Sequence, residues 1–504
     1  MVQTVGASWL MTSIAPSMDM VTLVQTANAL PFFLLSLWAG AVADTRDSRS
    51  IMLASQIVSL AASLALTCMV LMEMATPTLL LGLTFLVSSG AAMTAPAWQA
   101  SIGVLVPRPL VPTAVMANAL GFNLARSIGP AIGGLIVAAF GTGVAFATNA
   151  ASYVGMIGTL LWWRSTTTRS ELPSEPLGAA VAAGLRYVSL SPHLLSILLR
   201  CSLHTLPLVA VQALMPVVSR DLLHAGVTTF GALLGGFGVG AMLGALSSAA
   251  LRERYSSDAI LRRLPWVGLL STFAIAQSQW AVLTFLATLL SGAVWTTALT
   301  NFNIAIQLSS PRWVMGRVLA IYQTVALASV AFGSWFWGAV AQGFGLRETL
   351  TVAAVASLAP VMLGRGASIA TEQQQGSLDP RKVAQLKSGV EIPPSAGPIF
   401  VVIEYRVEPE KVDDFLSAIH EIGRIRRRDG ARSWTISQDI DSVDLWIERF
   451  ECPTWLDYLR WRTRLTESDQ APLERLQRLV VGTRGTVRRL VSCPMGAQPV
   501  RRPS

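Results

Sequence analysis

The sequence has few charged residues for its length. Of 504 residues, only 13% are Asp, Glu, Lys or Arg, whereas 52% are hydrophobic. Soluble domains carry about twice that charged fraction. The shortage is uneven: residues 1–366 hold 17 Arg, 10 acidic residues and no Lys, whereas residues 367–504 hold 21 basic and 19 acidic residues. This division excludes an ordinary soluble fold for the first part and indicates a membrane-embedded part followed by a water-soluble tail.

Other absences narrow the function. The four cysteines are scattered without metal-ligand spacing, so we expect no metal site and no disulfide framework. No G-x-x-x-x-G-K-[ST] phosphate loop occurs, which excludes ATP hydrolysis by this motif, and no cofactor is expected. The net charge of +9 would suit nucleic acid, but its distribution indicates the charge bias of a membrane protein, so no nucleic-acid partner is expected.

The hydrophobic residues fall into separate apolar segments, which predict an all-α polytopic membrane protein. A span needs roughly 20 apolar residues, so the first segment is too short to cross the bilayer unless it is tilted or re-entrant. The segments number twelve, at about 2–15, 19–43, 50–72, 78–99, 112–140, 143–163, 195–219, 228–251, 258–278, 280–300, 314–342 and 346–364.

Arginine placement predicts the topology. If the N-terminus is cytoplasmic, 13 of the 17 Arg before residue 367 lie on inward connections or helix ends, against only Arg220 and Arg347 outside. Positively charged connections stay on the cytoplasmic side of a membrane. We therefore expect a multi-pass protein of the inner (plasma) membrane with both termini in the cytoplasm.

The fifth segment contains residues that suit a lipid-facing helix poorly. Arg126 lies one turn before Gly129-Pro130, and Gly133-Gly134 follow. A charged side chain in the bilayer costs several kcal/mol unless it faces a polar interior. Glycines let a neighbouring helix approach closely, and proline bends a helix. The alternative is a kinked packing helix whose arginine reaches an interface.

This stretch resembles the fifth-helix motif G-x-x-x-G-P-x-x-G-G of antiporters of the major facilitator superfamily, with Ala125 at the leading glycine position. Two further stretches, Ala95–Ala100 and the pair Asn123 and Arg126, resemble the corresponding stretches of the enterobactin-exporter-like branch of this superfamily. The members of this branch are also described as transmembrane secretion effectors. The resemblance implies a 12-helix fold of two six-helix halves that exchange access to a central site. In such relatives residues 2–16 correspond to the second half of the first helix, so we expect that helix to be truncated here.

A second motif follows the second segment. The stretch with Gly40, Asp44, Arg46 and Arg49 resembles the superfamily's gating loop G-x-x-x-D-R-x-G-R-R, although Thr45 replaces its first arginine. The resemblance implies that Asp44 pairs with a cytoplasmic helix end. The alternative is an ordinary solvated turn.

Two polar residues in the seventh segment are candidates for coupling. Arg200 and His204 lie one turn apart and share a helix face. A histidine can titrate near neutral pH, although a single buried histidine more often packs or donates a hydrogen bond. Neutral polar residues outnumber carboxylates in the segments and predict a cavity for a large uncharged or anionic solute. They include Gln25, Asn28, Gln99, Asn118, Asn123, Gln212, Asn301, Asn303 and Gln323, with Trp98, Trp295 and Trp335.

The tail has the pattern of a small α+β domain. Strands are expected at 399–407, 432–439, 444–451 and 486–491, and helices at 409–428, 453–464 and 471–480. The order is close to that of a ferredoxin-like module. It resembles antibiotic-biosynthesis-monooxygenase-like domains, which implies pairing of sheets in a homodimer. We find no acid–base set around His420 and expect no enzyme activity and no catalytic residues.

The predicted organisation is a six-helix half at 1–163, a cytoplasmic linker with an amphipathic helix at 164–194, a second half at 195–366, a linker at 367–397, the ferredoxin-like domain at 398–491 and a disordered tail at 492–504. The first hypothesis for function is a proton-coupled exporter of an amphipathic small molecule, such as a siderophore or a drug, working across the lipid bilayer. The alternative is a membrane-anchored sensor or scaffold whose tail dimerises or recruits partners. A third hypothesis is a tail monooxygenase fed by the carrier.

Overall fold

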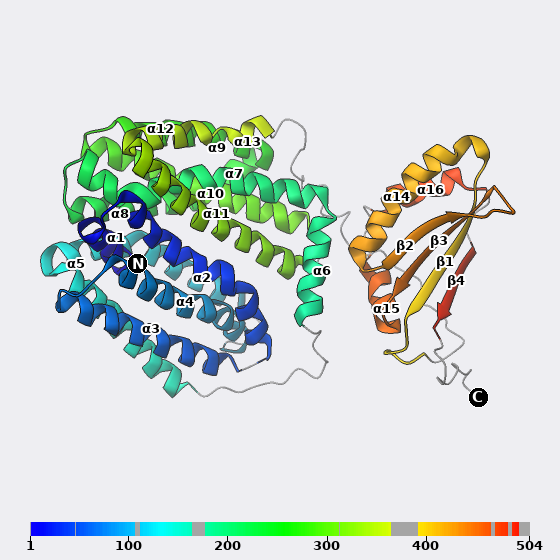
Figure 1. The fold of residues 1–504 in the computed structure, drawn as a ribbon, viewed down its shortest axis with the longest axis horizontal. Coiled ribbons are helices and arrows are strands. Elements are labelled where there is room, and N and C mark those ends of the chain that lie inside the picture. The colour runs from blue at the N-terminus through cyan, green and yellow to red at the C-terminus, as the bar shows by residue number, and fades with distance from the viewer. Residues whose placement is uncertain are drawn as a thin grey trace. The chain divides into compact units, whose positions relative to one another are not determined.

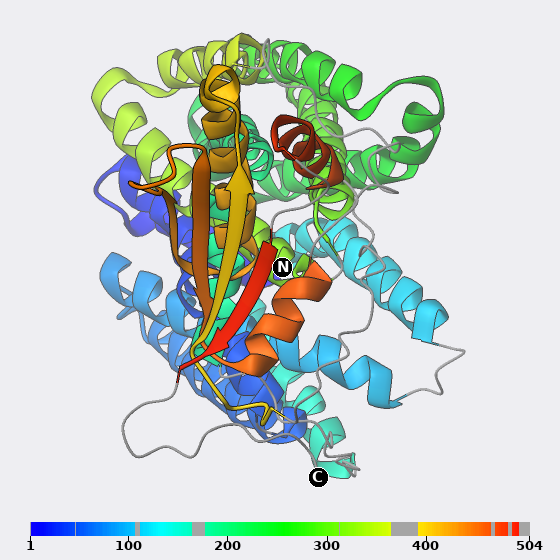
Figure 2. The same ribbon diagram turned by 90° about the vertical axis from the view of Figure 1, so that its right-hand side faces the viewer.

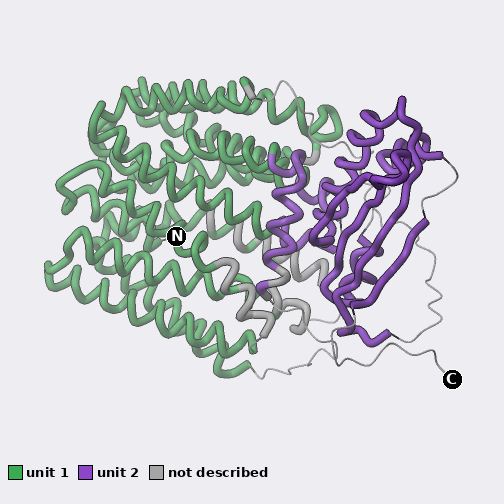
Figure 3. The backbone as a smooth tube through the Cα atoms, turned by 45° about the vertical axis from the view of Figure 1, so that its right-hand side comes forward, with its two compact units in different colours: residues 1–174, 196–305, 320–369 green, residues 175–195, 306–319, 370–504 purple. Residues whose placement is uncertain are grey.

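The computed structural model describes residues 2–45, 47–105, 111–163, 177–311, 313–363, 392–464, 469–481 and 486–492. The chain divides into two compact units (Figure 3). Unit 1 contains residues 1–174, 196–305 and 320–369, and unit 2 contains residues 175–195, 306–319 and 370–504.

The first half of unit 1 is built from long apolar helices that run roughly side by side (Figure 1). They are α1 (Val2–Ile14), α2 (Met18–Thr45), α3 (Ser48–Leu71), α4 (Pro77–Leu105) and α5 (Val111–Trp162). Helix α5 is two helices joined at Gly141, whose backbone has φ 84° and ψ 170°. Only glycine adopts such a conformation freely. The predicted boundary between the fifth and sixth segments is thereby confirmed, and α5 stays helical through Pro130.

The second half repeats this arrangement. Its helices are α7 (Pro192–Val217), which continues into the π-helical turn η2 (Val218–Leu222), α8 (Val227–Arg254), α9 (Ser257–Gln277), α10 (Ala281–Leu308), α11 (Met315–Phe344), α12 (Leu346–Ala356) and α13 (Ala359–Leu363). Within the described residues, nine helical stretches are long and apolar enough to cross a membrane, and one of them, Ile128–Trp162, contains the break at Gly141. Each of the twelve predicted segments is helical, and the 13-residue α1 is short as expected.

Glycines bring the helices of the second half into close contact. A Cβ atom at Gly240 would lie 1.7 Å from the carbonyl oxygen of Leu289, and one at Gly292 would lie 1.9 Å from that of Phe237. No side chain fits at these separations, so α8 and α10 pack backbone to backbone. Small residues serve this purpose where lipid replaces water and offers little hydrophobic drive for helix association.

The two halves meet at one end of unit 1. The Thr26 hydroxyl of α2 donates to the carbonyl oxygen of Ala331 in α11 at 2.9 Å, and the Met18 amide donates to Gln342 Oε1 at 2.8 Å. The Arg220 guanidinium donates to the Thr12 carbonyl oxygen. Thr12, Met18, Arg220 and Gln342 lie at the end of unit 1 where α1, α7 and α11 finish and α2 begins, so hydrogen bonds join the halves at this end.

The tail domain belongs to unit 2. It contains β1 (Ile399–Arg406), the 3₁₀ turn η5 (Pro409–Lys411), α14 (Val412–Asp429), β2 (Arg432–Gln438), β3 (Leu445–Cys452), α15 (Trp455–Arg464), α16 (Gln470–Leu479) and β4 (Thr486–Val491). The strands form one antiparallel sheet in the order β2-β3-β1-β4, side by side in Figure 2. This order confirms the predicted ferredoxin-like fold.

Buried and partly exposed side chains alternate along β1, and the buried ones form part of the core of the tail domain. In β1, Ile399, Val401 and Ile403 are buried while their neighbours are partly exposed. Successive side chains of a strand point to opposite faces, so the buried set covers one face. That face packs against Phe415 and Ile419 of α14, together with residues of α15 and α16.

The seam between the halves gives a test of the fold. A Cβ atom at Gly134 of α5 would lie 2.7 Å from the Cα atom of Gly231 in α8. We predict that Gly134→Val forces these helices apart and lowers the free energy of unfolding by about 1–3 kcal/mol, as expected for overpacking. Gly82→Val is the matched control, because nothing lies within 4 Å of that position. Unfolding of the purified protein in detergent measures the difference, and equal stability of both variants would contradict the seam.

Candidate functional site

A cavity of about 480 Å³ lies between the two halves of unit 1. Helices α1, α2, α4, α5, α7, α8, α10 and α11 all contribute to its wall. Its lining residues are Gln3, Thr4, Ser8, Gln25, Asn28, Ala29, Phe32, Val87, Ser88, Ala91, Pro130, Asn149, Tyr153, Thr205, Gln212, Phe230, Leu234, Phe237, Gly238, Trp295, Leu299, Ala326, Leu327 and Val330. Small-molecule sites usually have volumes of about 300–1,000 Å³, so this cavity can hold a drug-sized molecule.

The described part of the cavity wall consists of uncharged residues. None of the described lining residues is Asp, Glu, Lys, Arg or His. Aromatic rings occur beside amides and hydroxyls, and the Trp295 ring lies edge-on to Phe237 with centroids 6.4 Å apart. The wall therefore offers apolar contact and neutral hydrogen-bonding groups.

Several of the polar groups in the wall already have partners. The Ser88 hydroxyl donates to Asn28 Oδ1 at 3.0 Å, and Asn28 Nδ2 donates to the Val24 carbonyl oxygen at 3.0 Å. Asn149 Nδ2 donates to Gln3 Oε1 and to the Ser63 hydroxyl. These bonds fix the orientation of the amides and connect α1, α2, α3, α4 and α5.

Two buried donors in the wall have no partner among the described residues. They are Gln212 Nε2 of α7 and Trp295 Nε1 of α10. An unsatisfied buried donor costs about 1–3 kcal/mol, which an acceptor supplied by a bound molecule would recover. The sequence had identified Gln212 and Trp295 as cavity candidates, together with Gln25 and Asn28, and all four line the cavity.

The predicted glycine–proline motif is a junction of three helices. Pro130 lines the cavity. A Cβ atom at Gly133 would lie 3.1 Å from the Cα atom of Val2 in α1, and Gly134 faces Gly231 of α8. Gly129, directly before Pro130, is partly buried. The side chains of Asn123 and Arg126 are outside the part of α5 that the structure describes, so their roles stay predictions.

Arg200 and His204 lie inside unit 1 but are not among the residues that line the cavity. Arg200 Nη1 is 3.3 Å from Asp258 Oδ1 in the first turn of α9, and Arg262 also bonds to Asp258. His204 packs edge-on against Phe302 with ring centroids 6.0 Å apart, and its Nε2 has no hydrogen-bond partner among the described residues. The ion pair joins α7 to α9, an interaction that sequence reasoning missed because the two residues are 58 positions apart.

The predicted gating loop is shorter than expected, because Gly40 and Asp44 lie in the last turns of α2. The Asp44 side chain and the whole of Arg46 are outside the described residues. Asp47 caps α3 by accepting a hydrogen bond from the Ser50 amide at 3.2 Å. Arg49 donates to the carbonyl oxygens of Leu160 and Leu161 at 2.7 and 3.0 Å. A cation at the C-terminal end of α5 is favoured by the helix dipole and ties α3 to α5.

The profile of the family described as transmembrane secretion effector matches residues 1–495. The chain belongs to this family. It is thus a multi-pass membrane protein and a secondary transporter of the major facilitator superfamily, with a small-molecule substrate. The resemblance identified from Gly129-Pro130 and Gly133-Gly134 is confirmed.

Relatives of this transporter include two bacterial proteins. It is 27% identical over 355 residues to the multidrug efflux pump Tap of Mycolicibacterium fortuitum. This alignment covers 65% of this chain and 82% of Tap. It is 25% identical over 349 residues to the uncharacterized MFS-type transporter YfiS of Bacillus subtilis. This alignment covers 67% of this chain and 82% of YfiS.

Solved structures share the fold of the transporter. A bacterial homolog of the human lysosomal transporter Spinster, in an inward-facing and unoccupied conformation, superposes with a TM-score of 0.59 at 13% identity and covers 72% of this chain and 93% of that chain. The nucleoside transporter NupG superposes with a TM-score of 0.56 at 12% identity and covers 73% and 97% of the two chains. At these identities the likeness shows the fold alone.

The tail domain of the transporter has a buried polar group at its centre. Arg426 Nε donates to Glu448 Oε1 at 2.7 Å, and the Tyr405 hydroxyl donates to Glu448 Oε2 at 2.8 Å. Trp434 Nε1 also donates to Glu448 Oε1 at 2.8 Å. Every carboxylate oxygen of this fully buried Glu448 is engaged, which makes the group a structural element of the core.

A second buried carboxylate lies at the end of α14. Asp429 is fully buried and accepts hydrogen bonds from Arg428 Nε at 2.8 Å and Nη2 at 3.2 Å. Burial is the main cause that raises the pKa of Asp429, to about 6. The ion pair with Arg428 lowers this pKa, and the nearby carboxylate of Asp469 raises it. Arg428 also bonds to Asp469 at 2.8 Å, so one cation serves two carboxylates.

This pKa predicts a dependence of stability on pH. Because the folded pKa of Asp429 lies above its ordinary value of 3.8, the protonated form stabilises the fold below pH 4, and this contribution is lost as the pH rises through 6. The free energy of unfolding should therefore fall by on the order of 2 kcal/mol between pH 4 and pH 7, and we predict that Asp429→Asn removes this fall. Asp414→Asn, at an exposed position of α14, is the control. Thermal unfolding of the tail in the purified transporter, followed as a function of pH, measures this stability. The prediction is contradicted if the stabilities of Asp429→Asn and the parent change with pH in the same way.

Proposed function

We propose that the transporter exports a neutral amphipathic molecule bearing hydrogen-bond acceptors, and that an inward proton flow drives the export. The observation that carries this proposal is the cavity. Its described lining residues are uncharged, and two of them are buried donors without a partner among the described residues. Hydrogen bonds join the two halves at one end of unit 1.

The end at which hydrogen bonds join the halves is assigned to the outer side of the membrane. Connections at that end, including those around Arg220 and Arg347, carry little positive charge in the sequence. The opposite end carries Arg49, Arg252 and Arg254, as expected of the cytoplasmic side. On this assignment both termini are cytoplasmic and the cavity takes its solute from the cytoplasm, which suits an exporter.

The lining residues that the structure describes are uncharged, which favours a neutral solute over an anionic one. Arg200 is paired with Asp258, and a charged solute in this cavity would lose its hydration without gaining a counter-ion. A carbonyl or ether oxygen would instead satisfy Gln212 and Trp295. Recognition by ring contact and two donors also suits structurally varied solutes, which agrees with the multidrug efflux pump among the relatives.

Proton coupling is supported by the antiporter-like motif of α5. Arg126 lies four positions before Pro130, which lines the cavity. His204 is a buried imidazole whose Nε2 has no hydrogen-bond partner among the described residues. These groups are the proposed coupling residues. The enzyme role weighed for the tail is not proposed, because Glu448, Arg426 and Tyr405 satisfy one another in its core.

A flux assay in proteoliposomes tests this function. With a pH gradient imposed, Nile red, a neutral dye with a carbonyl acceptor, should accumulate, and ethidium, a permanent cation, should not. Gln212→Leu should raise the KM for Nile red about 3–10-fold, because one hydrogen bond of about 1 kcal/mol is lost. Gln277→Leu, an exposed amide away from the cavity, is the matched control.

Two results of this assay would contradict the proposal. Accumulation that persists after an ionophore collapses the pH gradient would exclude proton drive. Transport of ethidium in preference to Nile red would contradict the neutral cavity as the substrate site.

A further inference from the structure

Within unit 2, the tail domain contacts two segments of the transporter, one between its halves and one within its second half. The first is α6 (Leu177–Ser189), an amphipathic helix that leads directly into α7. The second is the segment between α10 and α11, which contains Trp313. Both segments and the tail belong to the same compact unit, so their mutual contacts are part of one body.

Two aromatic rings and two guanidinium groups contact one another at this junction. Tyr187 of α6 and Trp313 lie edge-to-face, with ring centroids 5.5 Å apart and an interplanar angle of 89°. The guanidinium carbon of Arg428 is 5.2 Å from the centroid of the Tyr187 ring, and that of Arg464 is 4.3 Å from the centroid of the Trp313 ring. The two connections supply the rings and the tail supplies the two cations. We call these four residues the clamp.

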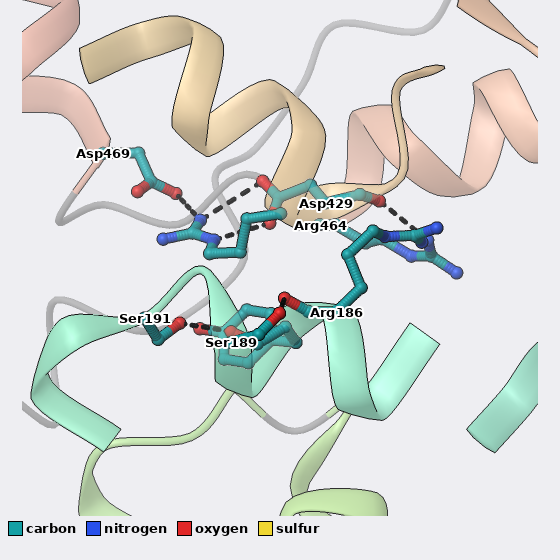
Figure 4. A network of polar contacts seen from close by, with 8 residues as sticks. Arg186, Ser189, Ser191, Asp429, Arg464 and Asp469 are labelled. Carbon is teal, nitrogen blue, oxygen red and sulfur yellow. Dashed lines mark hydrogen bonds and ion pairs between the residues drawn. The ribbon is translucent and has the colours of Figure 1, made fainter. Parts of the chain in front are cut away.

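The tail holds both cations in position for the rings. The side chain of Asp429 and that of Asp469 bind Arg428, while the main-chain carbonyl oxygen of Asp429 accepts a hydrogen bond from Arg464 Nη1 at 2.7 Å (Figure 4). A guanidinium that is already oriented loses less conformational entropy when it stacks on a ring. Asp429 therefore orients both cations, Arg428 through its side chain and Arg464 through its main-chain carbonyl oxygen.

Desolvation strengthens the clamp. Tyr187 is only 3% exposed, and the Arg428 side chain is 14% exposed. Cation–π contacts gain strength when water is excluded from the pair. The same junction also includes His193 at the start of α7, whose Nε2 lies 3.1 Å from the Ser309 hydroxyl.

The packing around the clamp is open. A cavity of about 430 Å³ lies in unit 2, and its lining residues include Tyr187, His193, Ser309, Arg424 and Arg428. An interface with such a void rests on few side chains, so the loss of one or two should release it. This property suits a reversible contact better than a permanent core.

We propose that the clamp holds the corner between α6 and α7 to the connection between α10 and α11, and that the tail thereby slows the transport cycle as a built-in brake. Helix α6 belongs to the segment that joins the two halves, so rocking of the halves displaces it relative to the connection between α10 and α11. A contact that stabilises one arrangement slows departure from it. The statement about the cycle rests on the proposed export function.

The test changes the rings and leaves the tail's own ion pairs intact. Tyr187→Leu and Trp313→Leu keep an apolar side chain but remove the ring faces. In the full-length protein in nanodiscs, hydrogen–deuterium exchange of the α6 amides should become roughly tenfold faster in the double variant, while exchange in β1 and β3 stays unchanged. A tenfold change corresponds to about 1.4 kcal/mol, within the range expected for two cation–π contacts. Nile red export by the same variant should rise severalfold.

Trp280→Leu, a substitution of an exposed ring outside unit 2, is the matched control and should change neither measurement. Unchanged exchange in α6 would overturn the clamp. Faster exchange without faster export would overturn the brake. Absence of Nile red export by the parent chain would contradict the proposed function, and this failure is distinguished from failure of the clamp because the exchange measurement does not depend on transport.

Discussion

The cost of placing charge in the bilayer is the constraint on which the rest of the structure depends. It keeps lysine out of residues 1–366 and pairs the buried Arg200 with Asp258. It places Arg49 at the end of α5, where main-chain carbonyl oxygens accept its hydrogen bonds. The central cavity follows the same rule, because its described wall uses amides, hydroxyls and rings in place of ions.

Helix packing adds a second requirement, which glycine meets. The contact of Gly134 with Gly231 joins the halves, and the contacts of Gly240 and Gly292 join α8 to α10. A transporter that alternates access must make and break contacts between its halves while each half stays intact. Contacts between small residues suit such motion because no interlocked side chains have to leave their rotamers.

Much of the fold was predictable from sequence because the signals are periodic and local. Apolar runs predicted all the helices of unit 1, and alternation predicted β1 and β3 in the tail. The interior of the site was partly predictable: Gln212 and Trp295 stood out as polar or amphipathic residues in apolar segments. The pairing of Arg200 with Asp258 was not, because no local pattern connects residues 58 positions apart. The homodimer through the tail and the exact domain boundaries remain predictions.

The central claim is that the cavity, whose described lining residues are uncharged, opens to the cytoplasm while its outer end is closed. Labelling with a membrane-impermeant maleimide tests it, in a chain whose four cysteines are replaced by serine. Ser88→Cys lies in the cavity wall, and Glu73→Cys lies on the exposed connection between α3 and α4. The account predicts that Glu73→Cys is labelled from outside intact cells and that Ser88→Cys is labelled only in inverted vesicles. Labelling of Ser88→Cys in intact cells with protection in inverted vesicles would contradict it.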